Sequence, residues 1–436
     1  MSFRKQHIDV ISMGCSKNLI DSERLLKRLN QRGYTVEHDS EEPSGEYVVV
    51  NTCGFINDAK EESINLLLEL SEAKKEGRIG KVVVMGCLSQ RYMDDLKAEL
   101  PDIDIWYGKF DWKDFIDRLP DLSGEAKPKE WERQLTTPPH SAYIKISEGC
   151  NRFCAFCAIP IITGRHTSRP IEEICEEVRS LVNDGVKEFN IIAQDLSSYG
   201  LDLYDRHALA ELVERLAMIP GVEWIRLHYA YPSDFPEDIL DVMARHKNVC
   251  SYLDIALQHS SNHMLERMNR HITAEETELL LAKMREKVPD IKIRTTLMVG
   301  FPGETDEDFE DLLKFVKRQK FDRMGAFAYS EEEDTFAAKN YGDDVPADVK
   351  QHRLDRLMAL QEEIAWNSAE ALEGKKIRIL IDDIEGDYRI GRSEWDSPEV
   401  DCCFYVSGTD AQPGDFINVK VVEARSPFDF MCVPVK

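Results

Sequence analysis

Three apolar, β-rich runs stand out in the first part of the chain, and the first two are followed by segments of helical period. The runs are IDVISMGC, YVVVNTCGF and KVVVMGC. In the segments DSERLLKRLNQRG and AKEESINLLLELSEAKKEG, apolar residues recur three and four positions apart, as along one face of a helix. Alternating strands and helices predict a parallel sheet, and we expect an α/β domain over residues 1–120.

From residue 142 onward the same alternation returns in a longer series. Six β-rich runs are separated by helical patterns: AYIKIS, EFNIIAQD, VEWIRLHY, YLDIAL, IKIRTTLMVGF and MGAFAYS. Repeated strand–helix units predict a partial, TIM-like (β/α)6 barrel, in which chemistry takes place at the carboxyl ends of the strands. We expect this domain to span residues 142–367 and the polar, proline-containing stretch 121–141 to be a linker.

The pattern changes again near the end of the chain. A long amphipathic segment leads to short alternating runs punctuated by Gly and Asp: KIRILIDDI, DYRIGRSEW, CCFYVSG, DFINVKVVEA and FMCVPVK. Such runs predict a small all-β barrel, which we place at residues 368–436. The predicted fold class is therefore multidomain α/β with a carboxyl-terminal all-β barrel.

Each of the three apolar runs in the first domain ends at a cysteine. These are Cys15, Cys53 and Cys87. Because the carboxyl ends of parallel strands lie along one edge of a sheet, where ligands bind, we expect the three thiols to meet in space. A single such cysteine would be read as a buried core thiol, but three at equivalent positions indicate a site.

Composition narrows the setting of this site. Of the 436 residues 42% are hydrophobic and 31% are charged, and no opening apolar run is long enough for a signal peptide or a membrane span. We therefore expect a cytoplasmic protein whose eleven cysteines stay reduced, so that clustered ones serve as metal ligands or catalysts. The net charge of −26 repels a polyphosphate and attracts a basic protein.

The loop EGCNRFCAFC, directly after the first strand of the second domain, carries Cys150, Cys154 and Cys157. Three thiolates can hold a cubane iron–sulfur cluster and leave one iron open to a small molecule. The alternative is a structural zinc site with His166 as the fourth ligand. The wide spacing of His166 and the place of the loop at the active edge of a barrel favour the cluster.

These residues carry a resemblance to a known family. CNRFCAFC resembles the signature of radical S-adenosylmethionine (SAM) enzymes, in which an aromatic residue, here Phe156, precedes the last cysteine. The whole layout, with a three-cysteine first domain, a radical SAM domain and a barrel of the TRAM type, is similar to that of methylthiotransferases. SMGCSKNLIDSE, VNTCGFINDAKEES and MGCLSQRY resemble the branch that modifies a ribosomal protein (RimO) rather than the tRNA-modifying branch (MiaB).

The resemblance implies two [4Fe–4S] clusters and two roles for S-adenosyl-L-methionine. A cluster at Cys150, Cys154 and Cys157 would cleave SAM to a 5′-deoxyadenosyl radical. A second cluster, held by the first-domain trio, would handle the inserted sulfur, and another SAM would supply the methyl group. The implied substrate is an aspartate of ribosomal protein S12, free or on the small subunit, methylthiolated at its β-carbon, with reducing electrons from a donor protein.

Further SAM contacts are expected at the strand ends of the second domain. The candidates are Phe156, Gln194, Asp195, Gln258 and Gly300. Of these, Gly300 belongs to the turn VGFPGET. Each could also be an ordinary loop residue or turn glycine. Two residues lie on the third strand of this domain, Arg226 and His228. We interpret Arg226 as a paired charge and His228 as a core histidine, and neither as a catalytic base.

The substrate class is the point that the sequence leaves most open. TRAM domains often bind RNA, yet acidic residues outnumber basic ones in this barrel, which suits a basic protein better than a phosphate backbone. Nucleic acid is therefore disfavoured as substrate. A tRNA methylthiotransferase and a metal-stabilised binding module without enzymatic activity remain as alternatives. No coiled-coil seam is present, and we expect a monomer.

Overall fold

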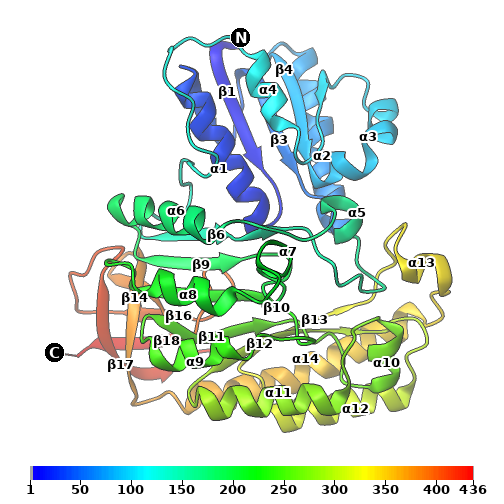
Figure 1. Cartoon of the computed structure of the whole chain (residues 1–436), viewed down its shortest axis with the longest axis vertical. Helices are drawn as coiled ribbons and strands as arrows, with labels where there is room; N and C mark the ends of the chain where they lie inside the picture. Colours follow the sequence, from blue (N-terminus) through cyan, green and yellow to red (C-terminus); the bar gives the residue numbers. More distant parts are fainter. Residues whose placement is uncertain (1–2, 436) are drawn as a thin grey trace. The chain divides into compact units, whose positions relative to one another are not determined.

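The computed structural model describes residues 3–435 (Figure 1). It contains two compact units. The first comprises the described residues up to Thr137 together with residues 148–150 and 158–165, and the second comprises the rest. Among the described residues, no helix combines the length and the apolar character that a bilayer crossing requires.

The first unit contains a five-stranded parallel sheet in the order β2-β1-β3-β4-β5. Its strands are β1 (Arg4–Ser12), β2 (Thr35–His38), β3 (Gly45–Thr52), β4 (Lys81–Gly86) and β5 (Ile105–Trp106). The three strands predicted from the sequence are the central ones. The short strands β2 and β5, at the two edges, were not predicted.

Helices cover both faces of this sheet, as Figure 1 shows. The helices of the unit are α1 (Ser16–Gln31), α2 (Asn57–Lys75), α3 (Cys87–Glu99), α4 (Trp112–Arg118) and α5 (Ile159–Thr163). Val49 packs with Leu26 of α1 and Phe115 of α4 on one face, while its neighbour Val50 packs with Leu67 of α2 on the other. Because both faces are covered, the central strands β3 and β4 carry continuous valine runs, Val48–Val50 and Val82–Val84, that are buried on both faces.

The polar segment predicted as a linker makes specific contacts with α1. Arg28 donates hydrogen bonds to backbone carbonyls of residues 129 and 130, and Trp131 is buried. Arg133 forms an ion pair with Glu23 in which both side chains are 1% exposed. This part of the predicted linker therefore has a fixed course along α1.

The second unit contains a six-stranded parallel sheet whose order follows the sequence, β13-β12-β11-β10-β9-β6. Its strands are β6 (Ser141–Lys145), β9 (Glu188–Ile192), β10 (Trp224–Ala230), β11 (Val249–Ile255), β12 (Lys292–Val299) and β13 (Arg323–Ala328). All six correspond to predicted strands, and the open sheet confirms the partial barrel. The short strands β7 (Ser147–Glu148) and β8 (Thr167–Ser168) pair separately.

Helices alternate with these strands. They are α6 (Ile171–Asn183), α7 (Leu201–Tyr204), α8 (Leu209–Ala217), α9 (Asp238–Arg245), α10 (Asn262–Arg267), α11 (Ala274–Lys287), α12 (Asp306–Gln319), α13 (Phe336–Asn340) and α14 (Ala347–Glu370). Capping boxes at Thr273 and Thr305 fix the starts of α11 and α12, because each threonine accepts a hydrogen bond from the free backbone N–H groups of the first turn. The predicted long amphipathic segment is α14.

The carboxyl-terminal part is a closed barrel in the order β14-β15-β16-β18-β17. Its strands are β14 (Lys376–Glu385), β15 (Tyr388–Ser393), β16 (Cys403–Val406), β17 (Phe416–Ala424) and β18 (Asp429–Pro434). Phe404 and Phe430 stack in its core at 4.8 Å between ring centroids. The predicted all-β barrel is confirmed, and closure removes the unpaired strand edges that an open sheet would expose.

This barrel packs against the amino ends of the strands of the six-stranded sheet. Glu188, at the start of β9, accepts hydrogen bonds from Arg226 of β10 and from Arg392 of β15, and the three side chains are buried. Burial alone would raise the pKa of Glu188, but Arg392 and Arg226 hold it well below its ordinary value. Arg226 is therefore the paired charge that the sequence analysis proposed.

Candidate functional site

The three first-unit cysteines lie at the carboxyl ends of three neighbouring strands. Cys15 follows β1 and precedes α1, Cys53 follows β3, and Cys87 follows β4 as the first residue of α3. The expected arrangement along one sheet edge is therefore present.

Glycines beside the cysteines allow these strand ends to approach closely. Gly14 has φ +86°, and a Cβ placed on it would lie 2.6 Å from Cβ and Sγ of Cys53. Gly86 has φ +105°, and its Cβ would lie 2.4 Å from the Thr52 carbonyl oxygen. Any larger residue at either position would push the loops apart, so the sequence MGC, found twice, serves to bring thiols together.

The three thiols are close enough to alter one another's ionisation. The pKa of Cys87 is raised to about 11, chiefly by burial; Lys109 lowers it, while the neighbouring Cys15 and Cys53 raise it. The pKa of Cys53 is raised by burial and by Cys15. The protein around Cys15 also desolvates its thiolate, but Lys17, the Asn18 backbone N–H and Lys109 bring its pKa below the ordinary value.

Lys109 is a buried lysine at this edge that the sequence analysis missed. Its ammonium donates to Asp21 Oδ2 at 2.9 Å and to Asn18 Oδ1 at 3.3 Å. The Cys87 thiol lies 3.5 Å from the same Asn18 oxygen. Burial opposes the charged form, yet Asp21 raises the pKa of Lys109 above its ordinary value. The thiols therefore share their edge with a fixed positive charge.

The second trio lies in one loop after β6. In the second unit, this loop is tied to the segment after α10: the Ala155 N–H donates to the Met268 carbonyl at 2.9 Å, and the Asn269 amide donates to the Phe153 carbonyl at 2.7 Å. The Cys157 N–H donates to the Cys154 carbonyl at 3.0 Å, which closes a tight turn between the two thiols.

Arg270 reaches Cys154 from that same segment. Its Nη1 lies 3.1 Å from Cys154 Sγ, and its ring-stacking partner is Tyr231, whose centroid lies 4.1 Å from the guanidinium carbon. Arg152 covers the same ring at 4.4 Å. The Arg270 guanidinium therefore lies against the Cys154 thiol, and both the Arg270 and the Arg152 guanidinium groups lie over the Tyr231 ring. Arg270 is buried, at 2% exposed.

Gln258 fits a ligand contact best among the predicted strand-end residues. It follows β11 with φ +71°, in the left-handed region that glutamine seldom adopts, and it is 8% exposed. Its Oε1 has no hydrogen-bond partner within residues 3–435. A buried amide oxygen without a hydrogen bond costs free energy. A bound group that donates to Gln258 Oε1 would explain why this oxygen has no protein partner and why the backbone of Gln258 is strained.

Ser260 and Tyr329 add to this pattern at the carboxyl end of the sheet. Ser260 Oγ and the Tyr329 hydroxyl are buried and without a partner in the part of the chain that the structure describes. Phe301 packs edge-on against Tyr329 at 5.1 Å and against Phe156 at 6.3 Å between centroids. The aromatic residue of the cysteine loop is thus held in an apolar cluster at this edge.

The other candidates have structural partners that account for them. Asp195 accepts hydrogen bonds from Arg152 Nε and from the Ser197 N–H. Gly300 has φ +72°, and a Cβ there would meet Lys350 Cγ at 2.3 Å. Gln194 lies beside Asp195 just after β9 and is half-buried. A ligand role for these three stays a prediction.

His166, the histidine considered as a fourth zinc ligand, contacts a neighbouring polar side chain instead. His166 is buried, and its Nε2 lies 3.1 Å from Ser168 Oγ, which also donates to Asp202. His228 is 4% exposed, and its Nε2 lies 3.3 Å from Asn190 Oδ1. Both are engaged core residues, which favours the cluster over zinc.

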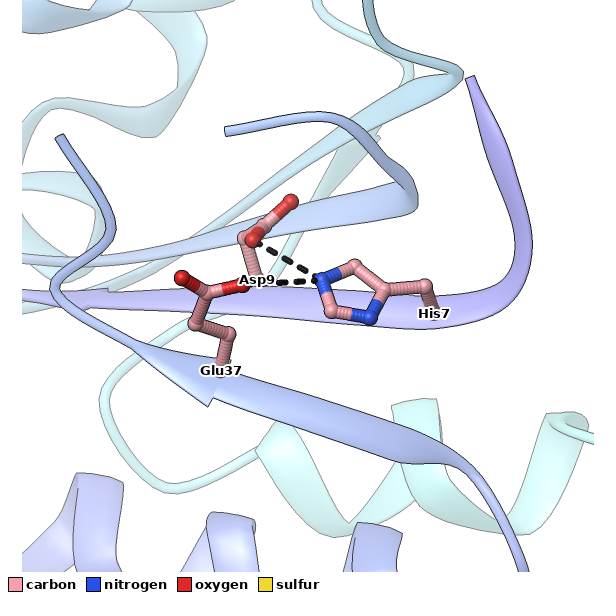
Figure 2. Close-up of side chains that lie close together, drawn as sticks. All are labelled: His7, Asp9 and Glu37. Atoms are coloured by element: carbon pink, nitrogen blue, oxygen red, sulfur yellow. Dashed lines mark hydrogen bonds and ion pairs between the residues drawn. The ribbon is translucent and has the colours of Figure 1, made fainter. Parts of the chain in front are cut away.

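Figure 2 shows a different group of potential metal ligands, on β1 and β2 of the first unit. His7, Asp9 and Glu37 place their ligand atoms within 4.8 Å of one another. However, Asp9 accepts hydrogen bonds from the Ser44 and Gly45 N–H groups at 2.9 and 2.7 Å. These bonds tie β1 to the start of β3, and the group is explained as a structural tie.

The chain matches three family models, one in each predicted region. They are the uncharacterized protein family UPF0004 over residues 7–108, the radical SAM superfamily over residues 144–316 and the TRAM domain over residues 374–435.

Relatives match over the whole length. The ribosomal protein uS12 methylthiotransferase RimO of Phocaeicola vulgatus is 57% identical over 425 residues, which cover 97% of this chain and 98% of that protein. The RimO protein of Flavobacterium johnsoniae is 47% identical over 437 residues, 99% of each chain. The chain belongs to the family of ribosomal protein uS12 methylthiotransferases. The predicted RimO branch is thereby confirmed over the tRNA-modifying branch.

Solved structures resemble this chain in fold alone. The radical SAM methyltransferase TsrM of Kitasatospora setae, with cobalamin and a [4Fe–4S] cluster bound, has a TM-score of 0.55 at 18% identity and covers 74% of this chain and 75% of that one. The radical SAM enzyme OxsB has a TM-score of 0.52 at 13% identity and covers 82% and 56%.

The donor sets fit the cofactors of a radical SAM enzyme. Each trio offers three thiols, which is the ligand chemistry of iron–sulfur clusters. The unpaired Gln258 oxygen and the Arg270 guanidinium, beside Cys154, offer an acceptor and a donor of the kind that an amino acid group requires.

Proposed function

We propose that this protein methylthiolates the β-carbon of an aspartate in ribosomal protein uS12. The observation that carries the proposal is the pair of three-cysteine sites, one at the carboxyl ends of three parallel strands and one in the loop after β6, in a chain that is 57% identical to a uS12 methylthiotransferase. A binding module without activity would not need two such thiol sites.

The roles of the residues follow from the chemistry. Cys150, Cys154 and Cys157 hold one [4Fe–4S] cluster, and Cys15, Cys53 and Cys87 hold the other. When bound, the clusters and S-adenosyl-L-methionine supply a reducing electron, a 5′-deoxyadenosyl radical, and the sulfur and methyl groups that are transferred.

The chain's own residues bind and orient SAM and exclude water. Arg270 donates to an anionic group beside Cys154, and the Gln258 side-chain oxygen accepts from an N–H donor. Phe156, Phe301 and Tyr329 form the apolar wall, which keeps water and stray hydrogen donors from a reactive carbon radical. Gln194, Asp195 and Gly300 line the same strand ends and are the weaker candidates for contact.

The partners follow from the charge of the chain. A net charge of −26 favours encounter with a basic ribosomal protein, free or on the small subunit, over encounter with RNA. The reaction requires a reducing electron-donor protein. We infer that it takes place in the cytoplasm, where ribosomal protein is made, and that the enzyme acts as a monomer.

We infer three domains, at residues 1–120, 142–367 and 368–436.

The test uses anaerobically reconstituted full-length protein with SAM and reductant. Free uS12, small ribosomal subunits and tRNA are offered in separate reactions, and the products are identified by mass spectrometry. We expect a methylthio group on one aspartate of uS12 with the parent protein and none with Cys154→Ala. Cys175→Ala, a buried core cysteine of α6, is the matched control and should retain activity. A methylthio adduct on tRNA with none on uS12 would reject the proposal in favour of the tRNA enzyme.

A further inference from the structure

Four neighbouring parallel strands of the first unit deliver a chemically active side chain to one edge of the sheet. β1, β3 and β4 deliver Cys15, Cys53 and Cys87, and β5, next to β4 in the sheet, is followed three residues later by Lys109. The lysine therefore occupies the structural position that the cysteines occupy on the other strands.

Asn18 links this lysine to all three cysteine-bearing strand ends. Its side-chain oxygen accepts from Lys109 Nζ and lies 3.5 Å from Cys87 Sγ. Its amide nitrogen donates to the Met13 carbonyl at 3.2 Å and to the Thr52 carbonyl at 3.0 Å, which are the turns that lead into Cys15 and Cys53. Asn18 therefore holds the Lys109 ammonium at a fixed position relative to the strand ends that carry the thiols.

The burial of Lys109 is expensive and calls for a reason. Its side chain is 2% exposed, and its carboxylate partner Asp21 is 9% exposed. Desolvating such a pair costs several kcal/mol per ion, and a well-packed apolar pair would often be as stable. A charged pair kept here, at the sheet edge that carries the three thiols, is better explained by what it does to negative charge at the site than by stability.

We propose that Lys109 is a positioning residue that sets the charge, and so the reduction potential, of the cluster bound by Cys15, Cys53 and Cys87. The proposal rests on the proposed function, which places a cluster there. Reduction adds one negative charge to a cluster that is already anionic, and net charge and hydrogen bonding around the sulfurs are what tune such potentials. The ammonium favours the reduced state, and Asp21 limits its effect.

The two charges of the pair give effects of opposite sign, which a merely structural role would not give. Lys109→Gln removes the positive charge and keeps a donor, so the potential becomes more negative. Asp21→Asn keeps the ammonium and its acceptor but removes the negative charge, so the potential becomes more positive. Lys109→Arg keeps the charge and should stay close to the parent.

The experiment measures the potential of this cluster alone. The background is the full chain with Cys150→Ala, Cys154→Ala and Cys157→Ala, in which the remaining iron must lie at the first trio. Each variant is reconstituted, its iron and sulfide are counted, and its potential is determined by redox titration followed by electron paramagnetic resonance. The matched control is Lys74→Gln, which removes a lysine paired with Asp104 elsewhere in the same unit.

We expect Lys109→Gln to disfavour reduction at least about tenfold, a shift of ~59 mV for one electron, and Asp21→Asn to favour it. Lys74→Gln should leave the potential unchanged. Equal potentials in Lys109→Gln, Asp21→Asn and the parent would overturn the proposal. If Lys109→Gln retained no iron, Asp21→Asn would decide by itself, since a positive shift upholds the proposal and no shift rejects it. A background protein without iron would instead reject the proposed function.

Discussion

The two ends of the six-stranded sheet bury polar groups in opposite ways. At the amino ends, the charges of the strands are paired with the carboxyl-terminal barrel: Glu188 with Arg226 and Arg392, and Arg323 of β13 with Asp396 at 2.7 Å. At the carboxyl ends, the oxygens of Gln258, Ser260 and Tyr329 are buried and unpaired, within the residues that the structure describes.

This difference separates what holds the fold from what binds. A buried charge that is ion-paired within the protein needs no ligand to compensate it, even though Nε of Arg226 and Nε of Arg323 make no hydrogen bond among the described residues. A buried group without a partner costs free energy in the empty protein and recovers it only when something binds. We therefore assign the strand ends that contact the TRAM barrel to stability, and we propose that the opposite strand ends, beside the cysteine loop, bind ligand.

The largest effect is expected at the paired end. Glu188→Ala leaves two buried guanidinium groups without their carboxylate, and we expect a loss of about 3–5 kcal/mol in the free energy of unfolding. Urea unfolding followed by circular dichroism measures it. The control Glu237→Ala breaks an exposed pair with Lys283 and should cost under about 1 kcal/mol. Equal losses in the two variants would erase the distinction between the ends.

The same pair predicts how the difference depends on pH. The pKa of Glu188 is lowered in the folded state, so its contribution to stability is complete above its ordinary pKa of 4.5 and is lost as pH falls toward the folded value. The difference in unfolding free energy between the parent and Glu188→Gln should be constant above pH 4.5 and narrow below it. A difference that widened in acid would contradict this assignment.

The second effect concerns the unpaired end. Arg270→Gln removes the guanidinium that lies against Cys154, and charge-assisted hydrogen bonds are worth about 1.5–3 kcal/mol. We expect 5′-deoxyadenosine formation to fall by about 10- to 100-fold in reconstituted protein that retains its iron. Arg245→Gln, an exposed arginine paired with Glu214, is the control. Unchanged cleavage in the iron-loaded Arg270 variant would remove this residue from the site.

A smaller effect is expected at the strained glutamine. Gln258→Met replaces the unpaired amide by an apolar side chain of similar length, so the empty protein should be as stable as the parent or more stable. SAM binding, measured by calorimetry on the iron-loaded protein, should weaken by about 1 kcal/mol, which corresponds to about fivefold in affinity. In the control Gln361→Met, which loses a hydrogen bond to the Phe321 carbonyl, stability should fall and SAM affinity should not.

The smallest effect is expected at the rim of the interface with the TRAM barrel. Arg378 pairs with Glu223 while both are 45% exposed, and it covers the Phe416 ring. Exposed ion pairs and cation–π contacts contribute about 0.5–1 kcal/mol each. Arg378→Gln should therefore cost far less in urea unfolding than Glu188→Ala. If Arg378→Gln lost as much unfolding free energy as Glu188→Ala, the exposed rim of the interface would stabilise it as much as the buried ion pairs do, which would contradict the assignment.

The sequence predicted elements where apolar runs were continuous and failed where they were short. β3 and β4 carry unbroken valine runs and β1 carries Ile8, Val10 and Ile11, whereas β2 and β5 have four and two residues and give no periodic signal. Missing β5 also meant missing Lys109, since its importance is visible only once the strand before it is recognised. The pattern DIDIWYGK, read as a short strand with a polar residue at its end, could have found it.

Contacts across long sequence separations explain the other omissions. Arg270 reaches a thiol 116 residues away, and Arg392 reaches Glu188 across 204 residues. No local pattern distinguishes such arginines from exposed ones. The positions of the cysteines, in contrast, could be predicted because parallel topology alone brings strand ends together. Gln258 was proposed on the same ground, and its ligand role stays a prediction.

The most direct test is the iron and acid-labile sulfide content of three full-length proteins reconstituted side by side. These are the parent, a variant with the first-unit trio changed to alanine, and a variant with the loop trio changed to alanine. We expect each variant to hold half the iron of the parent, with Cys175→Ala equal to the parent. If either trio could be removed without loss of iron, the two thiol sites would not be two cluster sites, and the function argued from them would be wrong.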